Sequence, residues 1–365
     1  MALKCGIVGL PNVGKSTLFN CLSNAEALAA NYPFATIEPN IGVVNVPDER
    51  MTKLEELVNP QRVVPTTVEI VDIAGLVAGA SKGEGLGNQF LGNIRDTDAI
   101  VHVIRCFDDD NVVHVSGSID PIRDKEIIDI ELQLKDLESV EKRIEKLQKR
   151  LKTNDKDVQK GIDILQVYKA HLETGQSART APLEPEARAF FNDLHLLTNK
   201  PILYVCNVDE DSAVEGNQYT KALEEAVKDE GAEVLYISAG MESEIMQLET
   251  YEERMEFLQE MGLTEPGINK LIQSCYRLLN LITYFTAGVK EVRAWTITKG
   301  TKAPQAAAVI HTDFEKGFIR AEVIGYEHYV TYGSESAVKE AGKFRVEGKE
   351  YVVADGDVMH FRFNV

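Results

Sequence analysis

The first 280 residues alternate short apolar runs with stretches of helical periodicity. The apolar runs have the character of buried strands and cover residues 3–8, 67–71, 99–106, 201–206 and 233–237. The first run leads through a turn-rich segment, 9–14, into a stretch that fits a helix over 15–30. Strands that alternate with helices predict βαβ units, and therefore a mostly parallel, doubly wound α/β sheet.

Residues 128–197 interrupt this alternation with a longer helical pattern. Apolar residues spaced 3, 4, 3 and 4 positions apart form a heptad seam at Leu137, Val140, Ile144, Leu147 and Leu151. A second helical face, at Val158, Ile162, Leu165 and Leu172, fits a helix that runs back after a turn at 153–155. The pattern predicts an antiparallel helical hairpin inserted between two strands of the sheet. Basic residues crowd its tip, at Lys142, Arg143, Lys146, Lys149, Arg150 and Lys152.

The chain changes character again after residue 281. Short β-prone runs cover 292–298, 318–323, 344–346, 350–353 and 359–363, and Gly, Asp and Lys turns separate them. These runs predict a small strand-rich domain. The expected organisation is therefore a sheet domain over 1–127 and 198–280, a helical insertion over 128–197 and a C-terminal domain over 281–365.

The charge is distributed unevenly along the chain. The net charge is −19, yet from residue 281 onward 11 basic residues balance 11 acidic ones. This excess of acidic residues argues against nonspecific nucleic-acid binding by the chain as a whole.

The apolar runs and the cysteines indicate the cellular setting. No apolar run approaches the roughly 20 residues that cross a bilayer. The five scattered cysteines favour reduced thiols in a cytoplasmic protein. Nothing in the pattern requires more than a monomer.

Residues 9–16 read GLPNVGKS and match the phosphate-binding pattern GxxxxGK[ST] in full. Glycines let backbone N–H groups approach a phosphate, Lys15 neutralises the β and γ oxygens, and the Ser16 hydroxyl binds Mg²⁺. A chance glycine-rich loop is the alternative. The motif follows a strand and opens a helix, which is the context that this P-loop needs. We therefore expect a nucleoside triphosphate site with magnesium.

The sequence Asp72-Ile73-Ala74-Gly75 follows a predicted strand some 55 residues after the P-loop. We expect Asp72 to hold the magnesium through a water molecule and the Gly75 N–H to sense the γ-phosphate. Thr36 lies between the two motifs and is the candidate for a switch threonine that coordinates the ion. Leu76 stands where many small GTPases have a glutamine that orients water. Because an apolar side chain cannot do so, we expect slow hydrolysis or a different catalytic group.

His114 is the candidate for that group. It lies in a loop-like stretch after the strand 99–106, and a neutral imidazole could orient or deprotonate water. A structural loop histidine is the alternative.

Recognition of the base is predicted after the strands 201–206 and 233–237. GTPases place Asn-Lys-x-Asp after the first of these strands, but this chain has Asn207-Val208-Asp209-Glu210. The longer Glu210 carboxylate is misplaced for the guanine donors, and Val208 lacks the lysine stem that covers one face of the base. The altered motif favours ATP, or relaxed specificity. Ser238 and Ala239 form the expected final loop at the base.

These motifs together resemble the YchF family of Obg-related NTPases. The resemblance rests on GLPNVGKSTLFN at 9–20, YPFATIEPN at 32–40, DIAGLV at 72–77, GEGLG at 83–87, Cys106-Phe107 and NVDE at 207–210. It covers the full chain and implies a coiled-coil insertion and a ubiquitin-like C-terminal TGS domain. It also implies a preference for ATP over GTP and binding to the ribosome, including the 50S subunit and the 70S particle, with a role in translation or stress control.

The resemblance also assigns residues. It implies that Asn12, Val13, Gly14, Lys15, Ser16 and Thr17 hold the phosphates. It implies that Ser16 and Thr36 ligate magnesium, that Val208 lies at the adenine and that His114 is the catalytic histidine. Two other functions stay open: a GTP-specific switch of the Obg kind, and an RNA-binding module whose nucleotide is structural, with rRNA contacted by the hairpin and the C-terminal domain.

Overall fold

The computed structural model describes residues 3–28, 40–73, 86–109, 111–115, 117–150 and 156–364. These residues form two compact units. The first contains the N-terminal strand, most of the helix after it and residues 69–268, and the second contains residues 43–68 and the chain from residue 269 onward. Among the residues that the structure describes, no helix combines the length and the apolarity that a membrane crossing needs.

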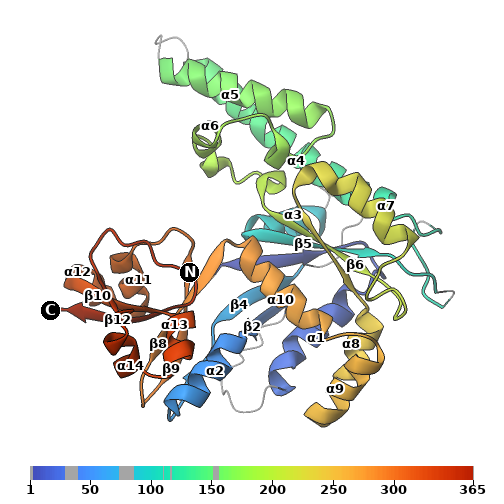
Figure 1. Cartoon of the computed structure of the whole chain (residues 1–365). Helices are drawn as coiled ribbons and strands as arrows, with labels where there is room; N and C mark the ends of the chain where they lie inside the picture. The colour runs from blue at the N-terminus through green and yellow to red at the C-terminus, as the bar shows by residue number, and fades with distance from the viewer. Residues whose placement is uncertain are drawn as a thin grey trace. The chain divides into compact units, whose positions relative to one another are not determined.

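A six-stranded sheet carries the first unit, in the order β2-β4-β1-β5-β6-β7 (Figure 1). Its strands are β1 (Lys4–Val8), β2 (Ile41–Asn45), β4 (Thr67–Asp72), β5 (Ala99–Arg105), β6 (Ile202–Asn207) and β7 (Glu233–Ile237). Strand β1 pairs in parallel with β4 and β5, and the parallel pairing continues through β6 to β7. Every residue of β5 and β6 is buried, as expected for parallel strands that are covered on both faces. The predicted strands of this sheet are confirmed, while β2 was not predicted.

Most helices of the first unit connect successive strands of the sheet, and the last two follow β7. They are α1 (Lys15–Leu28), α3 (Leu86–Arg95), α7 (Gln218–Val227), α8 (Ala239–Ile245) and α9 (Tyr251–Glu260), and α10 (Gly267–Leu278) leads into the second unit. Because the strands run parallel, their carboxyl ends all lie at one edge of the sheet. The carboxyl ends of β1, β4, β5, β6 and β7, with the described residues that follow them, therefore lie at that edge.

Helices α4 (Pro121–Arg150) and α5 (Lys156–Glu173) form the predicted hairpin. They share an apolar cluster that includes Val140, Ile144 and Leu165 from the predicted faces. The helix α4 begins at Pro121, before the expected start of the insertion, and the predicted turn at 153–155 lies outside the described residues.

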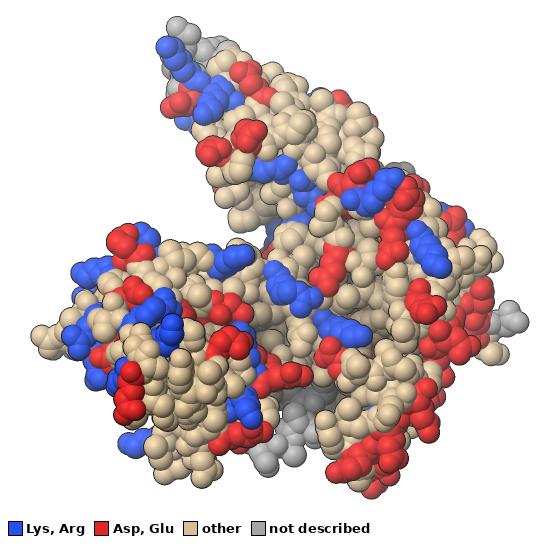
Figure 2. Space-filling view, viewed as in Figure 1, with Lys and Arg blue, Asp and Glu red and all other residues tan. Residues whose placement is uncertain are grey.

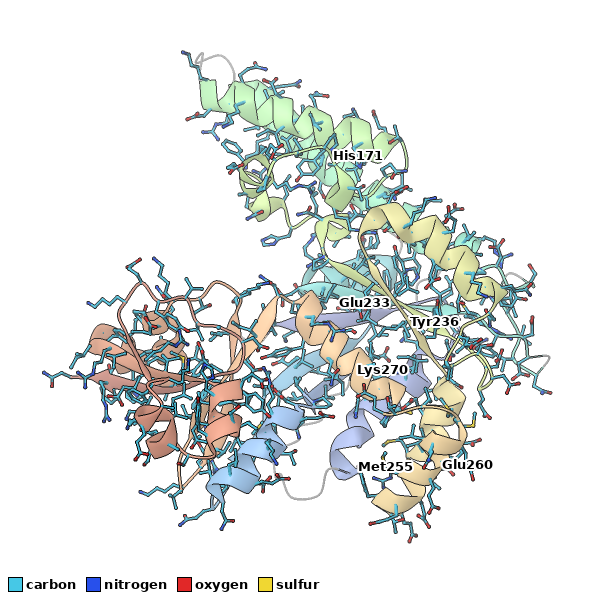
Figure 3. The ribbon with its side chains drawn as sticks, in the orientation of Figure 1. His171, Glu233, Tyr236, Met255, Glu260 and Lys270 are labelled. Atoms are coloured by element: carbon cyan, nitrogen blue, oxygen red, sulfur yellow. The ribbon has the colours of Figure 1, made fainter. Side chains whose placement is uncertain are left out.

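The chain returns from the hairpin to the sheet through short helical turns: η3 (Ala178–Thr180), α6 (Pro185–Ala189), η4 (Asn192–Leu194) and η5 (Leu197–Asn199). His171, labelled in Figure 3, lies near the end of α5. Its Nε2 is 2.9 Å from the Thr180 hydroxyl. The buried Asp136 carboxylate of α4 accepts hydrogen bonds from the backbone N–H groups of Leu197 and Thr198, both at 2.7 Å. Burial raises the pKa of Asp136 to about 6. The returning chain is thus fixed to α4.

The second unit contains another six-stranded sheet, in the order β11-β10-β12-β8-β9-β3. Its strands are β3 (Val63–Val64), β8 (Leu281–Ala287), β9 (Val292–Thr298), β10 (Phe318–Gly325), β11 (Arg345–Glu347) and β12 (Asp357–Phe363). Four of the predicted strands are confirmed. The run 350–353 is not a strand: Val352 forms only an isolated bridge with Lys302, so this prediction was wrong.

Helices that the strand pattern did not reveal complete this unit. They are α2 (Glu49–Val58), α11 (Ala303–Ile310), α12 (Thr312–Lys316), α13 (Tyr326–Tyr332) and α14 (Glu335–Glu340). One apolar cluster packs α11 against the sheet through Ala303, Ala306 and Ala307. The other contains Met51 and Leu54 of α2, and Val63 of β3 pairs with Val292 of β9. Residues 43–68, which precede the second nucleotide motif in sequence, therefore pack with the C-terminal part of the chain.

Candidate nucleotide site

The P-loop follows β1 and needs its glycines for space as well as for backbone conformation. Gly14 has φ of +90°, and a Cβ atom there would lie 2.2 Å from Asn207 Nδ2. A Cβ atom on Gly9 would lie 2.7 Å from the Val103 carbonyl oxygen. A side chain at either position would collide with a neighbouring strand or loop. The loop is therefore packed closely against the ends of β5 and β6.

Lys15 opens α1, and its ammonium group pairs with the Asp72 carboxylate at the end of β4. Only 8% of Lys15 is exposed, so this charge is held in place rather than free in solvent. The structure thus brings together two residues that the sequence assigned separately to phosphate and to magnesium. A buried cation at the start of a helix suits an anionic ligand.

The predicted magnesium ligands are oxygen donors of the type that Mg²⁺ prefers. Ser16 is exposed in the first turn of α1, beside Lys15, whose ammonium contacts Asp72. Thr36 lies outside the described residues, as do the switch residues Gly75 and Leu76. Within the described ranges, no group of three or more His, Cys, Asp or Glu side chains could hold a metal. Ser16 and Asp72 fit an ion that takes its remaining ligands from phosphate and water.

Buried Arg105 shapes the loop that follows β5. Its guanidinium donates to the carbonyl oxygens of Phe107, Asp109 and Val112, at 3.1, 3.1 and 2.7 Å, and lies 4.5 Å from the centre of the Phe107 ring. One side chain therefore fixes three successive parts of the loop. This is a structural reason for an arginine that is only 1% exposed at the end of a sheet strand.

A cavity of about 640 Å³ lies where the predicted base site was expected. It is lined by Asn12, Gly14, Thr17, Phe107, Asp108, Asp109, Val112, Asn207, Val208, Asp209, Glu210, Asp211, Ser238, Ala239 and Gly240. All five base-site residues predicted from the sequence are among them. Residues 107–109 and 112 were not predicted as site residues. Their place directly after β5, beside the strand that carries the P-loop, was the available signal.

Asn207 connects the two ends of this site. Its Nδ2 donates to the Val13 carbonyl oxygen at 2.9 Å, and its Oδ1 accepts from the Ala239 N–H at 2.9 Å. Asn207 is 3% exposed, so both bonds are shielded from water. The side chain thereby ties the P-loop to the loop after β7. Ser238 caps α8 by accepting from the Met241 N–H at 3.3 Å.

Five of the residues that line the cavity carry carboxylates. They are Asp108, Asp109, Asp209, Glu210 and Asp211. Such a lining accepts hydrogen bonds from amino and hydroxyl groups and disfavours phosphate, so it suits the base and the sugar of a nucleotide. The P-loop, with its buried lysine, supplies the complementary cationic end.

His114 is buried and contacts an acidic residue of α4. Its Nε2 lies 2.7 Å from Asp124 Oδ2, and the two residues are 8% and 1% exposed. The preceding residue, Val113, accepts a hydrogen bond from Asn12 Nδ2 of the P-loop at 3.1 Å. The structure therefore holds the predicted catalytic histidine in a loop that touches the phosphate-binding loop.

The five cysteines are buried and free of disulfides. A hydrogen bond with Cys106, and burial, raise the pKa of the Cys206 thiol. A raised pKa makes the buried Cys206 thiol a weak nucleophile. The structure buries all five thiols, as expected for structural cysteines.

Comparison with known proteins agrees with this geometry. A family model described as a 50S ribosome-binding GTPase matches residues 4–165. A model for the C-terminal domain of YchF GTPases, described as a protein of unknown function, matches residues 281–364. The ribosome-binding ATPase YchF of Haemophilus ducreyi is 58% identical over 365 residues, and that of Bacillus subtilis is 56% identical over 367 residues; each match covers both chains in full. The chain belongs to the YchF family.

A solved structure from the YchF family supports the fold directly. The Schizosaccharomyces pombe YchF GTPase matches with a TM-score of 0.89 at 42% identity, over 99% of this chain and 97% of that one. A GTP-binding protein from Pyrococcus horikoshii matches with a TM-score of 0.61 at 21% identity, which shows the shared fold alone. The P-loop NTPase fold with α/β sheets, predicted from the sequence, is confirmed.

Proposed function

We propose that this chain is a magnesium-dependent ATPase that binds the ribosome and acts as a nucleotide switch in translation or stress control. The observation that carries the proposal is the joined site: a P-loop with buried Lys15 at one end, an acidic cavity at the other, and Asn207 bonded to both. The names of the relatives, ribosome-binding ATPases, support the same activity.

The preference for ATP over GTP rests on the base end. Guanine donates hydrogen bonds from N1 and N2, and the aspartate of the Asn-Lys-x-Asp motif accepts them. This chain has Glu210 in place of that aspartate and Val208 in place of the lysine. Adenine needs neither residue, and Val208 offers an apolar surface. Asn12 to Thr17 of the P-loop hold the phosphates in this proposal, and Ser238 and Ala239 close the base site.

Magnesium would be held by Ser16, by Thr36 and, through water, by Asp72. The ion supplies charge neutralisation at the β- and γ-phosphates when it is bound. Lys15 neutralises phosphate oxygens, and the backbone N–H groups of the P-loop and of Gly75 hold them in place. With Leu76 at the usual glutamine position, His114 is the residue that orients or deprotonates the attacking water, and intrinsic turnover is slow.

Ribosome binding is assigned to the hairpin and the C-terminal domain, which we propose are a coiled coil and a ubiquitin-like TGS domain. Figure 2 shows basic side chains at the outer end of the hairpin, where α4 carries Lys146, Lys149 and Arg150. Phosphate-rich rRNA of the 50S subunit, alone or in the 70S particle, is the partner that such a tip fits. A cytoplasmic monomer suits this role.

Competition between fluorescent mant-ATP and mant-GTP, combined with phosphate release, tests the nucleotide assignment. We expect tighter ATP binding and slow, magnesium-dependent release of phosphate. Tenfold tighter binding of GTP would establish the GTP-specific switch instead. The absence of hydrolysis with and without ribosomes would establish a structural nucleotide.

Reversal of the tip charges, Lys146→Glu, Lys149→Glu and Arg150→Glu together, tests the ribosome assignment. Cosedimentation with 50S subunits should fall strongly and the remaining binding should become less sensitive to salt. Unchanged cosedimentation would remove the tip from the binding surface. The matched control is reversal of Arg95, Lys221 and Lys228, which are exposed and lie outside both the hairpin and residues 281–365, and this control should leave binding intact.

A further inference from the structure

We infer that an aromatic groove in the second unit is a binding site for unpaired nucleotides of RNA, and that Arg293 and Phe363 set its affinity. The groove is a cavity of about 480 Å³, and its lining includes Trp295 of β9, Phe314 of α12 and Phe363 of β12. The inference rests on the proposed contact between the C-terminal domain and rRNA. It names the part of that domain that binds and the kind of RNA that it takes.

The groove lies on a face of the second sheet that α11 covers only in part. Strands β12, β8 and β9 are neighbours on this sheet, in that order. Tyr284 of β8 donates a hydrogen bond to the Ala306 carbonyl oxygen of α11 at 2.9 Å, so the helix covers the strand there. Thr286, two residues further along β8, faces the same side and lines the groove. The helix therefore leaves one end of this face open.

Aromatic rings stand on both sides of this open end. Trp295 belongs to the strand on one side of β8, and Phe363 belongs to the strand on the other side. The Trp295 indole N–H donates to the Thr286 hydroxyl at 2.9 Å, which fixes the ring. The rings of Phe314 and Phe363 stack with their centres 3.6 Å apart, and 37% of Phe363 stays exposed. Rings that are ordered and partly exposed are surfaces on which unpaired bases stack.

Arg293 places a positive charge on the same face. It pairs directly with Thr286 in the ladder between β8 and β9, and it precedes Trp295 by two residues. Its guanidinium carbon lies 4.0 Å from the centre of the Trp295 ring. Within the described part of the chain, this guanidinium makes no hydrogen bond and no ion pair. All of its N–H donors therefore remain for a ligand such as a phosphate or a base edge.

The charges around the groove favour an anionic ligand. Among the described residues that line it, Glu291 is the only carboxylate, and Arg62 donates to this carboxylate at 2.9 Å. Figure 2 shows further Lys and Arg side chains at the end of this unit where β12 ends. An unpaired RNA strand supplies flat bases for the rings and phosphates for Arg293. A neutral apolar peptide would leave the guanidinium without an acceptor, and a duplex would keep its bases from the rings.

Trp295 is the only tryptophan of the chain, so its fluorescence reports on the groove directly. Titration of the full-length protein with a single-stranded RNA of about ten nucleotides and mixed sequence should quench this fluorescence. The same strand annealed to its complement should give a much weaker response, because its bases are already stacked on each other. Uridine monophosphate should also respond weakly, because it brings one base without a chain of phosphates.

Substitutions at Phe363 and Arg293 separate stacking from charge, and the anisotropy of a labelled strand measures their effect independently of Trp295. Phe363→Leu stays apolar but loses the ring, so the affinity should fall by roughly 5- to 50-fold, whereas Phe363→Tyr should stay within about twofold of wild type. Arg293→Gln should weaken binding and reduce the slope of log K against log salt concentration by about 0.7. Arg293→Lys should keep that slope but recover only part of the affinity, because the planar group is lost.

Two matched controls change similar side chains outside the groove. Lys299→Gln removes an exposed cation that follows the opposite end of β9, and Val346→Ala shortens an apolar side chain of β11 that is 58% exposed. Both variants should bind the strand like wild type. If Phe363→Leu does not fold, Arg293→Gln carries the test: wild-type affinity and salt dependence in that variant would overturn the inference.

The outcomes distinguish the groove from the proposed ribosome binding. If the protein sediments with 50S subunits but Trp295 does not respond to the single strand, the inference fails and the ribosome assignment stands. If the protein does not sediment with 50S subunits but the strand binds in a manner that depends on Arg293 and Phe363, the ribosome assignment fails and the groove remains an RNA site. Equal responses to the strand and to the duplex, or to uridine monophosphate, would overturn the choice of unpaired RNA. A response to ribosomal proteins freed of RNA, with none to the RNA, would replace it with a protein partner.

Discussion

The phosphate end and the base end of the proposed nucleotide site are built in different ways. The phosphate end comes from one continuous loop between β1 and α1, joined by Asp72 at the end of the neighbouring strand β4. The base end is assembled from three loops, after β5, β6 and β7, whose cavity-lining residues are spread from Phe107 to Gly240 in sequence. Only Asn207 makes bonds toward both ends among the described contacts of this cavity.

A short sequence motif is sufficient at the phosphate end but not at the base end. A phosphate can be recognised by consecutive N–H groups and one cation, so a short sequence carries the whole requirement. A base needs groups on several sides, and the sheet has to bring them together. The ends should therefore respond differently to substitution: changes at the phosphate end should weaken every nucleotide alike, and changes at the base end should alter the choice between nucleotides.

The largest effect is expected for Lys15→Ala. It removes the buried cation and leaves the Asp72 carboxylate without its partner, which costs about 3–5 kcal/mol for a buried pair. ATP and GTP should both lose affinity by at least about 100-fold, as measured by calorimetric titration. Lys4→Ala is the control, because Lys4 pairs with Glu69 of β4 at a more exposed position, 3.2 Å apart. Retained affinity in Lys15→Ala would contradict the assignment of the phosphate end.

Gly14→Ala should come next. The new Cβ would need a left-handed backbone and would overlap Asn207 Nδ2, so the P-loop or Asn207 must move. We expect a loss of about 2–4 kcal/mol in the free energy of unfolding and weaker binding of both nucleotides. In Gly240→Ala the nearest atom would be Ser238 Oγ at 3.9 Å, and this variant should unfold like wild type in urea. Equal stability of the two variants would mean that the loop relaxes freely.

Asn207→Ala tests whether the two ends depend on each other. It breaks the bonds to Val13 and Ala239, with an expected cost of about 1–3 kcal/mol for the buried groups left unpaired. Affinities for ATP and GTP should fall by a similar factor, because the P-loop loses its support. A change confined to one nucleotide would make Asn207 a base contact only. Replacement of the exposed Asn192 by alanine should have no effect on either affinity.

The smallest effect is expected for Glu210→Asp. The shorter carboxylate approaches the position that suits guanine, so the affinity for GTP relative to ATP should rise by a few-fold, about 1 kcal/mol or less. Val208 still lacks the lysine stem, which limits the gain. Competition between mant-ATP and mant-GTP measures the ratio. The neighbouring Asp211→Glu should leave the ratio unchanged, and a fall in GTP affinity with Glu210→Asp would contradict our reading of the base end.

The hairpin shows how far periodicity could predict the fold. Leu165 and Ile144 were predicted on the helical seams and lie in the shared apolar cluster. The base of α4 could not be predicted in this way, because Lys125 is buried in ion pairs with Asp129 and Glu230. Charged residues in a sequence are normally read as exposed, and only partners from distant segments make their burial tolerable.

The elements that could be predicted from the amino-acid sequence are those whose physical requirement is local. Strands that are buried on both faces must be apolar throughout, a helical seam must repeat every three or four residues, and a phosphate loop must carry glycines, lysine and serine in order. The residues of the P-loop and of the altered base motif were found for this reason.

The three-dimensional arrangement of the chain set the contacts between segments that are distant in sequence. It joined residues 43–68 to the C-terminal unit through β3 and α2, added residues 107–109 and 112 to the base cavity and placed Asp124 on His114. No local pattern marks these contacts, because their stability comes from burial against segments far away in the chain.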